Sequence, residues 1–197
     1  MKSVAELKNA HKGEDVFVLG SGPSMDFYLE GFFDNRLCVG VNHVYKYIPC
    51  QYSVFKEAMD PTDDTTLIVS EYARGWTKEK NKVGDYVFKH RSVASGLKPI
   101  DFDDETFLVS RSTLTSALHF AAHIGARAVF VAGHDCGMID GREVMTGYHD
   151  EYRGCWQGNL EEYAAWLKSL PEQTHVIERW LRNEYGCQFV TMDPIAL

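Results

Sequence analysis

The chain has little positive charge for its size. Its 197 residues carry 20 lysines and arginines against 28 acidic residues, which gives a formal net charge of −8. Such an acidic chain argues against broad electrostatic binding to duplex nucleic acid or to anionic membranes. A small pocket for one anion, such as a phosphorylated metabolite, is still compatible with this charge.

Long apolar runs and paired cysteines are also lacking. No apolar run reaches the ~18 residues that a membrane span requires, and the first ten residues lack the apolar stretch of a signal peptide. The five cysteines include no C-x-x-C pair, which favours free thiols over a disulfide framework or a zinc site. We therefore expect a cytoplasmic protein with no membrane span.

What the chain does contain is an alternation of short apolar runs and amphipathic stretches. It predicts an α/β fold with a mainly parallel, Rossmann-like sheet and helices on both faces, in a single domain over 1–197. Residues 60–110 have weak periodicity and are interpreted as an insertion or lid. Strands are expected at 16–19, 37–41, 52–55, 66–69, 128–132 and 188–191, and helices at 3–12, 25–33, 112–125, from 159 onward and from 171 to 186.

A glycine-rich turn, Gly20-Ser-Gly-Pro-Ser24, follows the first predicted strand. At the N-terminus of a helix, backbone N–H groups and the helix dipole can bind a phosphate, and glycines allow it to approach closely. An ordinary strand-to-helix turn with Ser24 as the N-cap is the alternative interpretation. The turn lacks the Gly-Lys-Ser/Thr of a Walker loop, and Met25 stands where a dinucleotide fingerprint has its third glycine.

Three polar segments follow predicted strands: 20–24, 42–45 and 133–135. Ligands of parallel α/β sheets bind beyond the carboxyl ends of the strands, so we expect these segments to meet at one edge. The glycine-rich turn also resembles the first motif of S-adenosylmethionine methyltransferases. Those enzymes usually have an acidic residue at the end of the second strand, where this chain has Asn42, and this disfavours a methyltransferase.

Three stretches together resemble a known superfamily in order and spacing. They are Phe17-Val-Leu-Gly-Ser-Gly-Pro-Ser24, Val39-Gly-Val-Asn42, and the helix, strand and Gly-x-Asp of 112–135. They are similar to the bacterial sialyltransferases of the Campylobacter type and to hydroxymethylpterin diphosphokinase-like proteins, which include flagellin-glycosylation accessory proteins. The resemblance covers most of the chain and implies a nucleotide site. The residues that it implies for this site are Gly20, Ser21, Gly22, Pro23, Ser24, Asn42, Ser112, Thr113, Gly133 and Asp135.

The chain departs from the sialyltransferases at their general base. Ser169 stands where they have a histidine, and Gly137 stands where they have a phosphate-binding tyrosine. We interpret the polar loop 133–154 as the source of substitutes, with His149 as the general base and Asp135 as a second catalytic residue. Histidine suits this role because its ordinary pKa lies near neutral pH.

The resemblance therefore favours a transferase that uses a nucleotide-activated sugar of the CMP type. Two alternatives stay open: a Mg²⁺-dependent diphosphokinase that acts on a small hydroxymethyl substrate, and a nucleotide- or glycan-binding module without turnover. Mg²⁺ would bind through aspartate oxygens, and no other cofactor or metal is predicted. The expected partners are a nucleotide or nucleotide-sugar and a small-molecule or glycan acceptor. The loops 60–110 and 136–158, or another subunit of a homo-oligomer, would recognise the acceptor.

Overall fold

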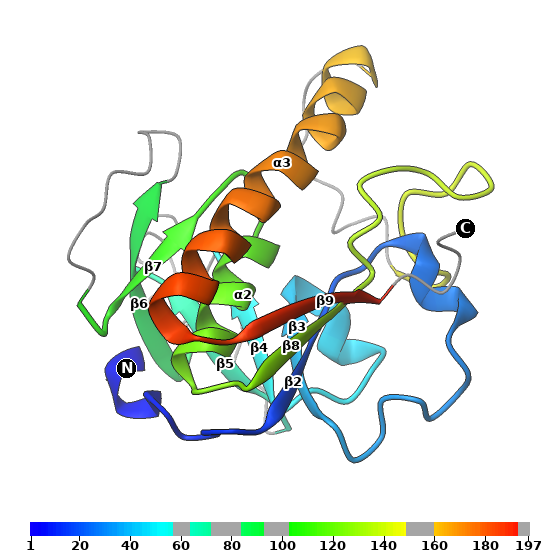
Figure 1. Cartoon of the computed structure of the whole chain (residues 1–197). Coiled ribbons are helices and arrows are strands. Elements are labelled where there is room, and N and C mark those ends of the chain that lie inside the picture. Colours follow the sequence, from blue (N-terminus) through cyan, green and yellow to red (C-terminus); the bar gives the residue numbers. More distant parts are fainter. Residues whose placement is uncertain (57–63, 72–83, 93–102, 149–159, 193–197) are drawn as a thin grey trace.

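The computed structural model describes residues 1–56, 64–71, 84–92, 103–148 and 160–192. Its strands form one nine-stranded sheet, and every pair of neighbouring strands is parallel (Figure 1). The strands are β1 (Lys2–Ser3), β2 (Asp15–Leu19), β3 (Leu37–Val41), β4 (Tyr52–Phe55), β5 (Thr66–Ser70), β6 (Tyr86–Ser92), β7 (Thr106–Val109), β8 (Ala128–Ala132) and β9 (Gln188–Met192). The helices are α2 (Leu114–His123) and α3 (Leu160–Tyr185), with 3-10 turns η1 (Val4–Leu7), η2 (Pro23–Phe27) and η3 (Asn42–Lys46).

The order of the strands reverses next to β2. From β2 the chain adds β3, β4, β5 and β6 in one direction, and both β1 and β7 pair with β6. The chain then passes through α2 and places β8 on the other side of β2, followed by β9. A reversal of this kind opens a crevice at the carboxyl ends of the strands, where α/β proteins bind ligands.

All six predicted strands are confirmed, with bounds that differ by one residue at most. The described parts of 60–110 differ from our interpretation. Beyond β5, which was predicted within this range, they contribute β6 to the body of the sheet and β7 to its edge, rather than a lid with little regular structure. β6 is mostly polar, with Lys89, His90 and Arg91 in its second half. Apolar periodicity therefore does not reveal it.

The helix predictions are confirmed in part. α2 lies within the predicted range, and Ser3 caps the first turn by accepting the N–H of Ala5 at 3.2 Å, although that turn is 3-10. The helix predicted over 25–33 is wrong, because only the short 3-10 turn η2 forms there. A helix boundary at Pro171 is also wrong, since α3 continues through it. The buried residues Leu170, Thr174, Ile177 and Leu181 form one continuous helix face across the proline, so tertiary packing outweighs its local preference.

The two α-helices share one core cluster, so the expectation of helices on both faces is not met by the described residues. Val16 and Val18 of β2 point into this cluster, together with Leu118 of α2 and Ile177 of α3. Phe17 and Leu19 point to the opposite face, which η2, η3 and the segment around Met145 cover in part. No helix among the described residues has both the length and the hydropathy needed to cross a membrane.

Candidate functional site

Two loops meet backbone to backbone at the reversal of strand order. Gly20 N donates to the carbonyl of Ala132 at 2.8 Å, and Gly22 N donates to the carbonyl of Gly133 at 2.9 Å. A Cβ at Gly20 or Gly22 would collide with the Gly133 carbonyl, and Gly133 itself has a positive φ of 69°. The expectation that the segments 20–24 and 133–135 come together is therefore confirmed, and their glycines are required by this contact.

The contact changes the interpretation of the glycine-rich turn. Ser24 N donates to Asp135 Oδ2 at 3.0 Å, so the carboxylate occupies the start of η2 where a phosphate was expected. The N–H groups of Gly20, Gly22 and Ser24 are all engaged within the protein, and Pro23 has none. The glycines thus serve loop packing, and the backbone of this turn does not form an open phosphate cradle.

Polar side chains remain unpaired around this contact. Ser24 is 1% exposed, and its Oγ has no hydrogen-bond partner. Among the described residues, nothing donates to or accepts from Ser21 Oγ or the Asn42 side-chain amide. Asn42 directly follows β3, the neighbour of β2, and has a positive φ of 54°. Left-handed backbone at a non-glycine residue is uncommon and concentrates at functional sites.

A second polar group surrounds the start of α2. Ser110 and Thr115 bond to each other, with Ser110 N donating to Thr115 Oγ1 at 3.0 Å, and Ser112 Oγ accepts the N–H of Leu114 at 3.2 Å. Lys56, which directly follows β4, donates from Nζ to the carbonyl of Ser110 at 2.7 Å. Its ammonium group thus lies on the segment that leads into the ten-residue helix α2, and the N-terminus of a helix favours anions.

His134 and Cys136 lie close together, with Cys136 Sγ 3.5 Å from His134 Nε2, but their protonation states do not suit a nucleophilic pair. Burial, followed by the nearby His175, lowers the pKa of His134 to about 4. Burial, followed by the charge of Asp135, raises the pKa of Cys136 to about 11. At neutral pH the pair is therefore a neutral imidazole and a protonated thiol. Thr174 Oγ1 of α3 bonds to His134 Nε2 at 2.9 Å and fixes its ring.

The loop after β8 is tied back to η2 through Asp26. Thr146 N donates to Asp26 Oδ1 at 2.9 Å, Thr146 Oγ1 donates to Oδ2 at 2.9 Å, and Arg142 forms an ion pair with the same carboxylate. Burial on its own would raise the pKa of Asp26, but the bonds from Thr146 and Arg142 outweigh it and lower the pKa. The carboxylate thus remains ionised at neutral pH and anchors residues 142–146.

We expect the Asp26→Ala substitution to release this loop. Hydrogen bonds to a charged group stabilise by about 1.5–3 kcal/mol when buried, and partial exposure reduces the expected loss to about 1 kcal/mol. Trypsin cleavage at Arg142 should become faster, as measured by mass spectrometry. The matched control is Glu30→Ala, which removes an exposed acid from the neighbouring segment. Equal cleavage rates in both variants would contradict the anchoring role.

The predicted site residues therefore separate into groups. The segments 20–24 and 133–135 are in contact, and Asn42 lies one strand away from them. Ser112 and Thr113 lie at the start of α2 and form no hydrogen bond with either of these groups. His149 lies outside the described residues. The sequence reasoning missed Lys56 and Asp26. Lys56 could have been found, because a lysine that directly follows a buried strand lies at the ligand-binding edge of a parallel sheet. No local sequence pattern indicates the role of Asp26.

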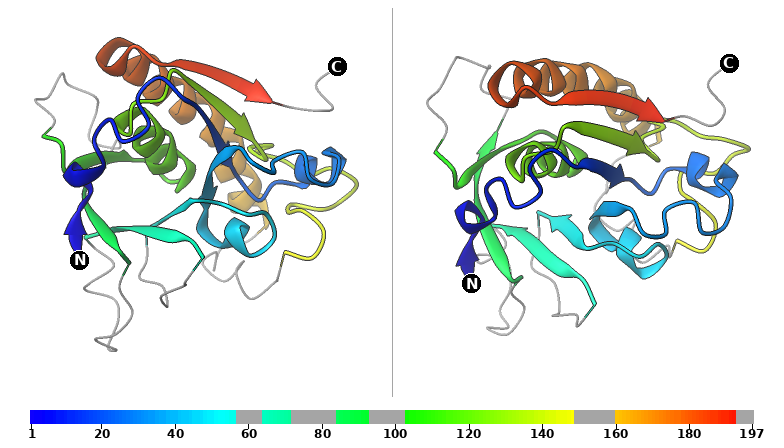
Figure 2. Two further views of the ribbon diagram at one scale, coloured as in Figure 1. Left: turned by 90° about the horizontal axis from the view of Figure 1, so that it is seen from below. Right: turned by 60° about the horizontal axis from the view of Figure 1, so that its bottom comes forward.

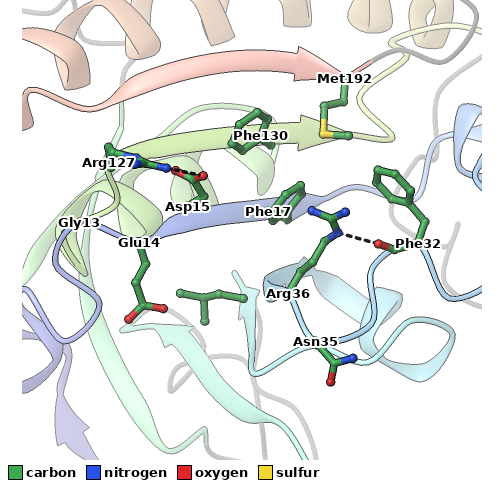
Figure 3. A pocket seen from close by; sticks show the side chains of 11 residues that line it. Gly13, Glu14, Asp15, Phe17, Phe32, Asn35, Arg36, Arg127, Phe130 and Met192 are labelled. Atoms are coloured by element: carbon green, nitrogen blue, oxygen red, sulfur yellow. Dashed lines mark hydrogen bonds and ion pairs between the residues drawn. The ribbon is translucent and has the colours of Figure 1, made fainter.

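A hollow on the described surface lies away from this edge. It is an open depression of about 540 Å³ lined from β2, β8 and β9, with Phe17, Phe130 and Met192 on its floor (Figure 3). No group of three or more histidine, cysteine, aspartate or glutamate side chains arranged to hold a metal occurs in the described parts of the chain. Comparison with known protein families and with curated protein sequences finds no match for this chain.

Proposed function

We propose that the protein is a nucleotide-binding transferase with a Rossmann-like arrangement, and that its donor is a nucleotide-activated sugar of the CMP type. The observation that carries this proposal is the interlocked pair of loops at the reversal of strand order, between β2 and β8. This is where parallel α/β sheets bind nucleotides. The loops are held rigidly by backbone bonds, so polar side chains beside them are preorganised for a ligand.

The unpaired polar groups support a nucleoside at this position. A hydroxyl left without a partner costs about 1–3 kcal/mol when buried, and Ser24 Oγ is such a group. The amide of Asn42 can donate to and accept from a ribose or a base. Ser21, Ser24 and Asn42 therefore offer hydrogen-bonding capacity that no described residue uses.

The start of α2 and Lys56 support a phosphate at the neighbouring strand ends. The amides of Gly20, Gly22 and Ser24 are engaged, and the amide of Leu114 is likewise bonded to Ser112 Oγ, so an anion site at the start of α2 would rely on the Ser112 and Thr113 hydroxyls and on the helix dipole. Lys56 Nζ adds a positive charge to it in a protein of net charge −8. Transfer would then rest on holding the donor and stabilising the leaving phosphate, with His149 as the proposed base.

Thermal unfolding in the presence of CMP, UDP, GDP, ATP with Mg²⁺, or S-adenosylmethionine tests this proposal. A ligand at 100 times its Kd stabilises the folded state by about 2.7 kcal/mol, and CMP is expected to give the largest shift. Asn42→Ala should reduce that shift. Asn35→Ala is the matched control, because Asn35 has a similar positive φ, 59° against 54°, but lies before β3 at the opposite end of that strand.

Two outcomes would overturn the proposal: no stabilisation by any nucleotide, or the same loss of the CMP shift in Asn35→Ala as in Asn42→Ala. Stabilisation by ATP with Mg²⁺ alone, abolished in Asp135→Asn, would instead favour the diphosphokinase.

A further inference from the structure

Three polar side chains lie toward the carboxyl ends of β4, β5 and β6, which are neighbouring strands of the sheet (Figure 2). The core cluster that contains α2 also includes one residue from each of these strands: Val54, Ile68 and Phe88. Because the side chains of a strand alternate, the residues two positions further along point to the same face. These residues are Lys56, Ser70 and His90. Polar groups therefore follow the apolar core at this end of the sheet.

Hydrogen bonds hold this polar group together. Ser70 Oγ lies 3.3 Å from His90 Nδ1, and the N–H of His90 donates to Glu71 Oε1 at 3.0 Å. Lys56 Nζ donates to the carbonyl of Ser110, between β7 and α2, at 2.7 Å. Ser70 is fully buried, whereas His90 and Lys56 are half-buried. The ring of His90 is therefore held in place at the carboxyl edge of the sheet and stays in contact with solvent.

Lys56 and Glu71 are the charged side chains that face His90 in the described parts of the chain. Neither β7 nor the first turn of α2 contributes a charged residue. Burial, followed by the charge of Lys56, lowers the pKa of His90, and the charge of Glu71 partly offsets this. The imidazole is therefore neutral at neutral pH before a ligand binds.

The contacts of His90 allow its ring to gain a proton. A serine hydroxyl can donate to Nδ1 of a neutral ring and accept from Nδ1 of a charged ring, so the contact with Ser70 survives protonation. His119 differs, because its Nδ1 accepts the backbone N–H of Leu108 and would lose this bond. Of these two histidines, only His90 can change its charge without loss of a backbone hydrogen bond to its ring.

The start of α2, which Ser110 connects to Lys56, also has unused hydrogen-bonding capacity. Ser110 Oγ accepts the N–H of Ser112 at 3.1 Å. Ser116, in the first turn of the helix, is fully buried, and its Oγ has no partner among the described residues. A phosphate monoester at this position would bring up to about two negative charges toward the ammonium group of Lys56.

We propose that His90 is a second phosphate-binding residue beside Lys56, and that its ring takes up a proton from solvent when a phosphate monoester binds at the start of α2. The negative charge of the phosphate offsets the charge of Lys56 and favours the imidazolium, which in turn attracts the phosphate. In the proposed transfer, the charged ring stabilises the leaving phosphate. This inference rests on the proposed function for the position of the phosphate, and it adds His90 and a linked proton to that site.

Isothermal titration calorimetry of the full chain tests the proposal, with CMP, inorganic phosphate and cytidine as probes. In buffers of different ionisation enthalpy, the enthalpies of CMP and phosphate binding should reveal proton uptake, and cytidine should show none. Ionisation of the phosphate itself, whose second pKa is about 6, would release protons instead. The Kd for CMP should decrease from about pH 8 to about pH 6.5, by at most about tenfold per pH unit for one proton.

Three variants locate the proton. His90→Gln should remove both the proton uptake and the decrease in Kd, because glutamine can bond to Ser70 but carries no charge. Lys56→Met should weaken CMP binding and raise the pKa of His90 in the absence of CMP, as measured by NMR of the ring. His11→Gln is the matched control, because His11 is also half-buried and bonded to a hydroxyl, that of Tyr52 at 2.9 Å, but lies before β2.

Circular dichroism establishes that each variant is folded. CMP binding without proton uptake would overturn this inference and leave the proposed function standing. The inference would equally fail if folded His90→Gln kept the uptake, if His11→Gln lost it, or if Lys56→Met left the pKa of His90 unchanged. Phosphate binding with proton uptake but no CMP binding would overturn the proposed function alone, and binding of neither probe would overturn both.

Discussion

Gly133→Ala should be among the most destabilising single substitutions in this chain. The φ of Gly133 is 69°, and left-handed backbone costs an L-residue about 1–2 kcal/mol. An added Cβ would also lie 2.6 Å from the carbonyl oxygen of Gly20 and 2.7 Å from Cγ of Met25. Forcing an extra carbon into a packed region costs about 1–3 kcal/mol. The two loops at the strand reversal would have to separate.

Chemical denaturation measures this effect, and Gly141→Ala is the matched control. Gly141 has a similar φ of 73°, but a Cβ there would meet nothing within 4 Å. The control should therefore lose about 1–2 kcal/mol from backbone strain alone. If both variants lose the same free energy of unfolding, the steric contact between the two loops does not add to the cost of Gly133→Ala. A larger loss in Gly133→Ala, together with a weaker CMP shift, would link this packing to ligand binding.

Folding stability should fall steeply as the pH decreases below about 6.5, the ordinary pKa of histidine. Burial lowers the pKa of His119, His123 and His134, with a value of about 4 for His134. Below about pH 6.5 the unfolded chain binds protons that these folded-state rings do not. Stability is thus fully present above that pH and is lost as the pH decreases toward the folded pKa values, by about 1.4 kcal/mol per pH unit for each histidine.

His119 provides the sharpest test of this pH dependence. Its Nδ1 accepts the N–H of Leu108, so the neutral ring carries its proton on Nε2 and donates to the hydroxyl of Tyr185 at 2.9 Å. A proton on Nδ1 would remove the first bond from a fully buried ring that lies against the partly buried Trp180 at a centroid distance of 5.4 Å. His119→Gln should lower stability at neutral pH and flatten the acid-dependent loss. Urea unfolding followed by tryptophan fluorescence measures both changes.

The matched control is His175→Gln, because His175 is exposed on α3. This variant should retain most of the acid-dependent loss, because it leaves His119 in place and removes only the His175 charge that helps to lower the pKa of His134. An acid-dependent loss that stays unchanged in His119→Gln would show that His119 does not contribute to it.

Most of the predicted strands could be located because the runs that form them are buried on both faces, although β9 is half exposed. A continuous apolar run such as 128–132 is typical of a buried strand, and the structure places it inside the sheet, between β2 and β9. The strand β6 could not be found in this way. It contains Lys89, His90 and Arg91, and only its pairing with β5 and β7 makes it a strand. Local sequence preference also fails at Pro171, because the packing of α3 keeps the helix continuous through the proline.

The amino-acid sequence by itself determined the α/β class, most of the strands, α2 and the meeting of the segments 20–24 and 133–135. These follow from burial periodicity and from the rule that parallel strands bring their carboxyl ends to one edge. The tertiary structure alone decided how the glycines are used. Gly20, Gly22 and Gly133 allow two backbones to touch, and Asp135 takes the N–H of Ser24 that a phosphate was expected to bind. Hydrogen-bond partners more than 100 residues apart cannot be read from local pattern, because only the folded chain brings them within bonding distance.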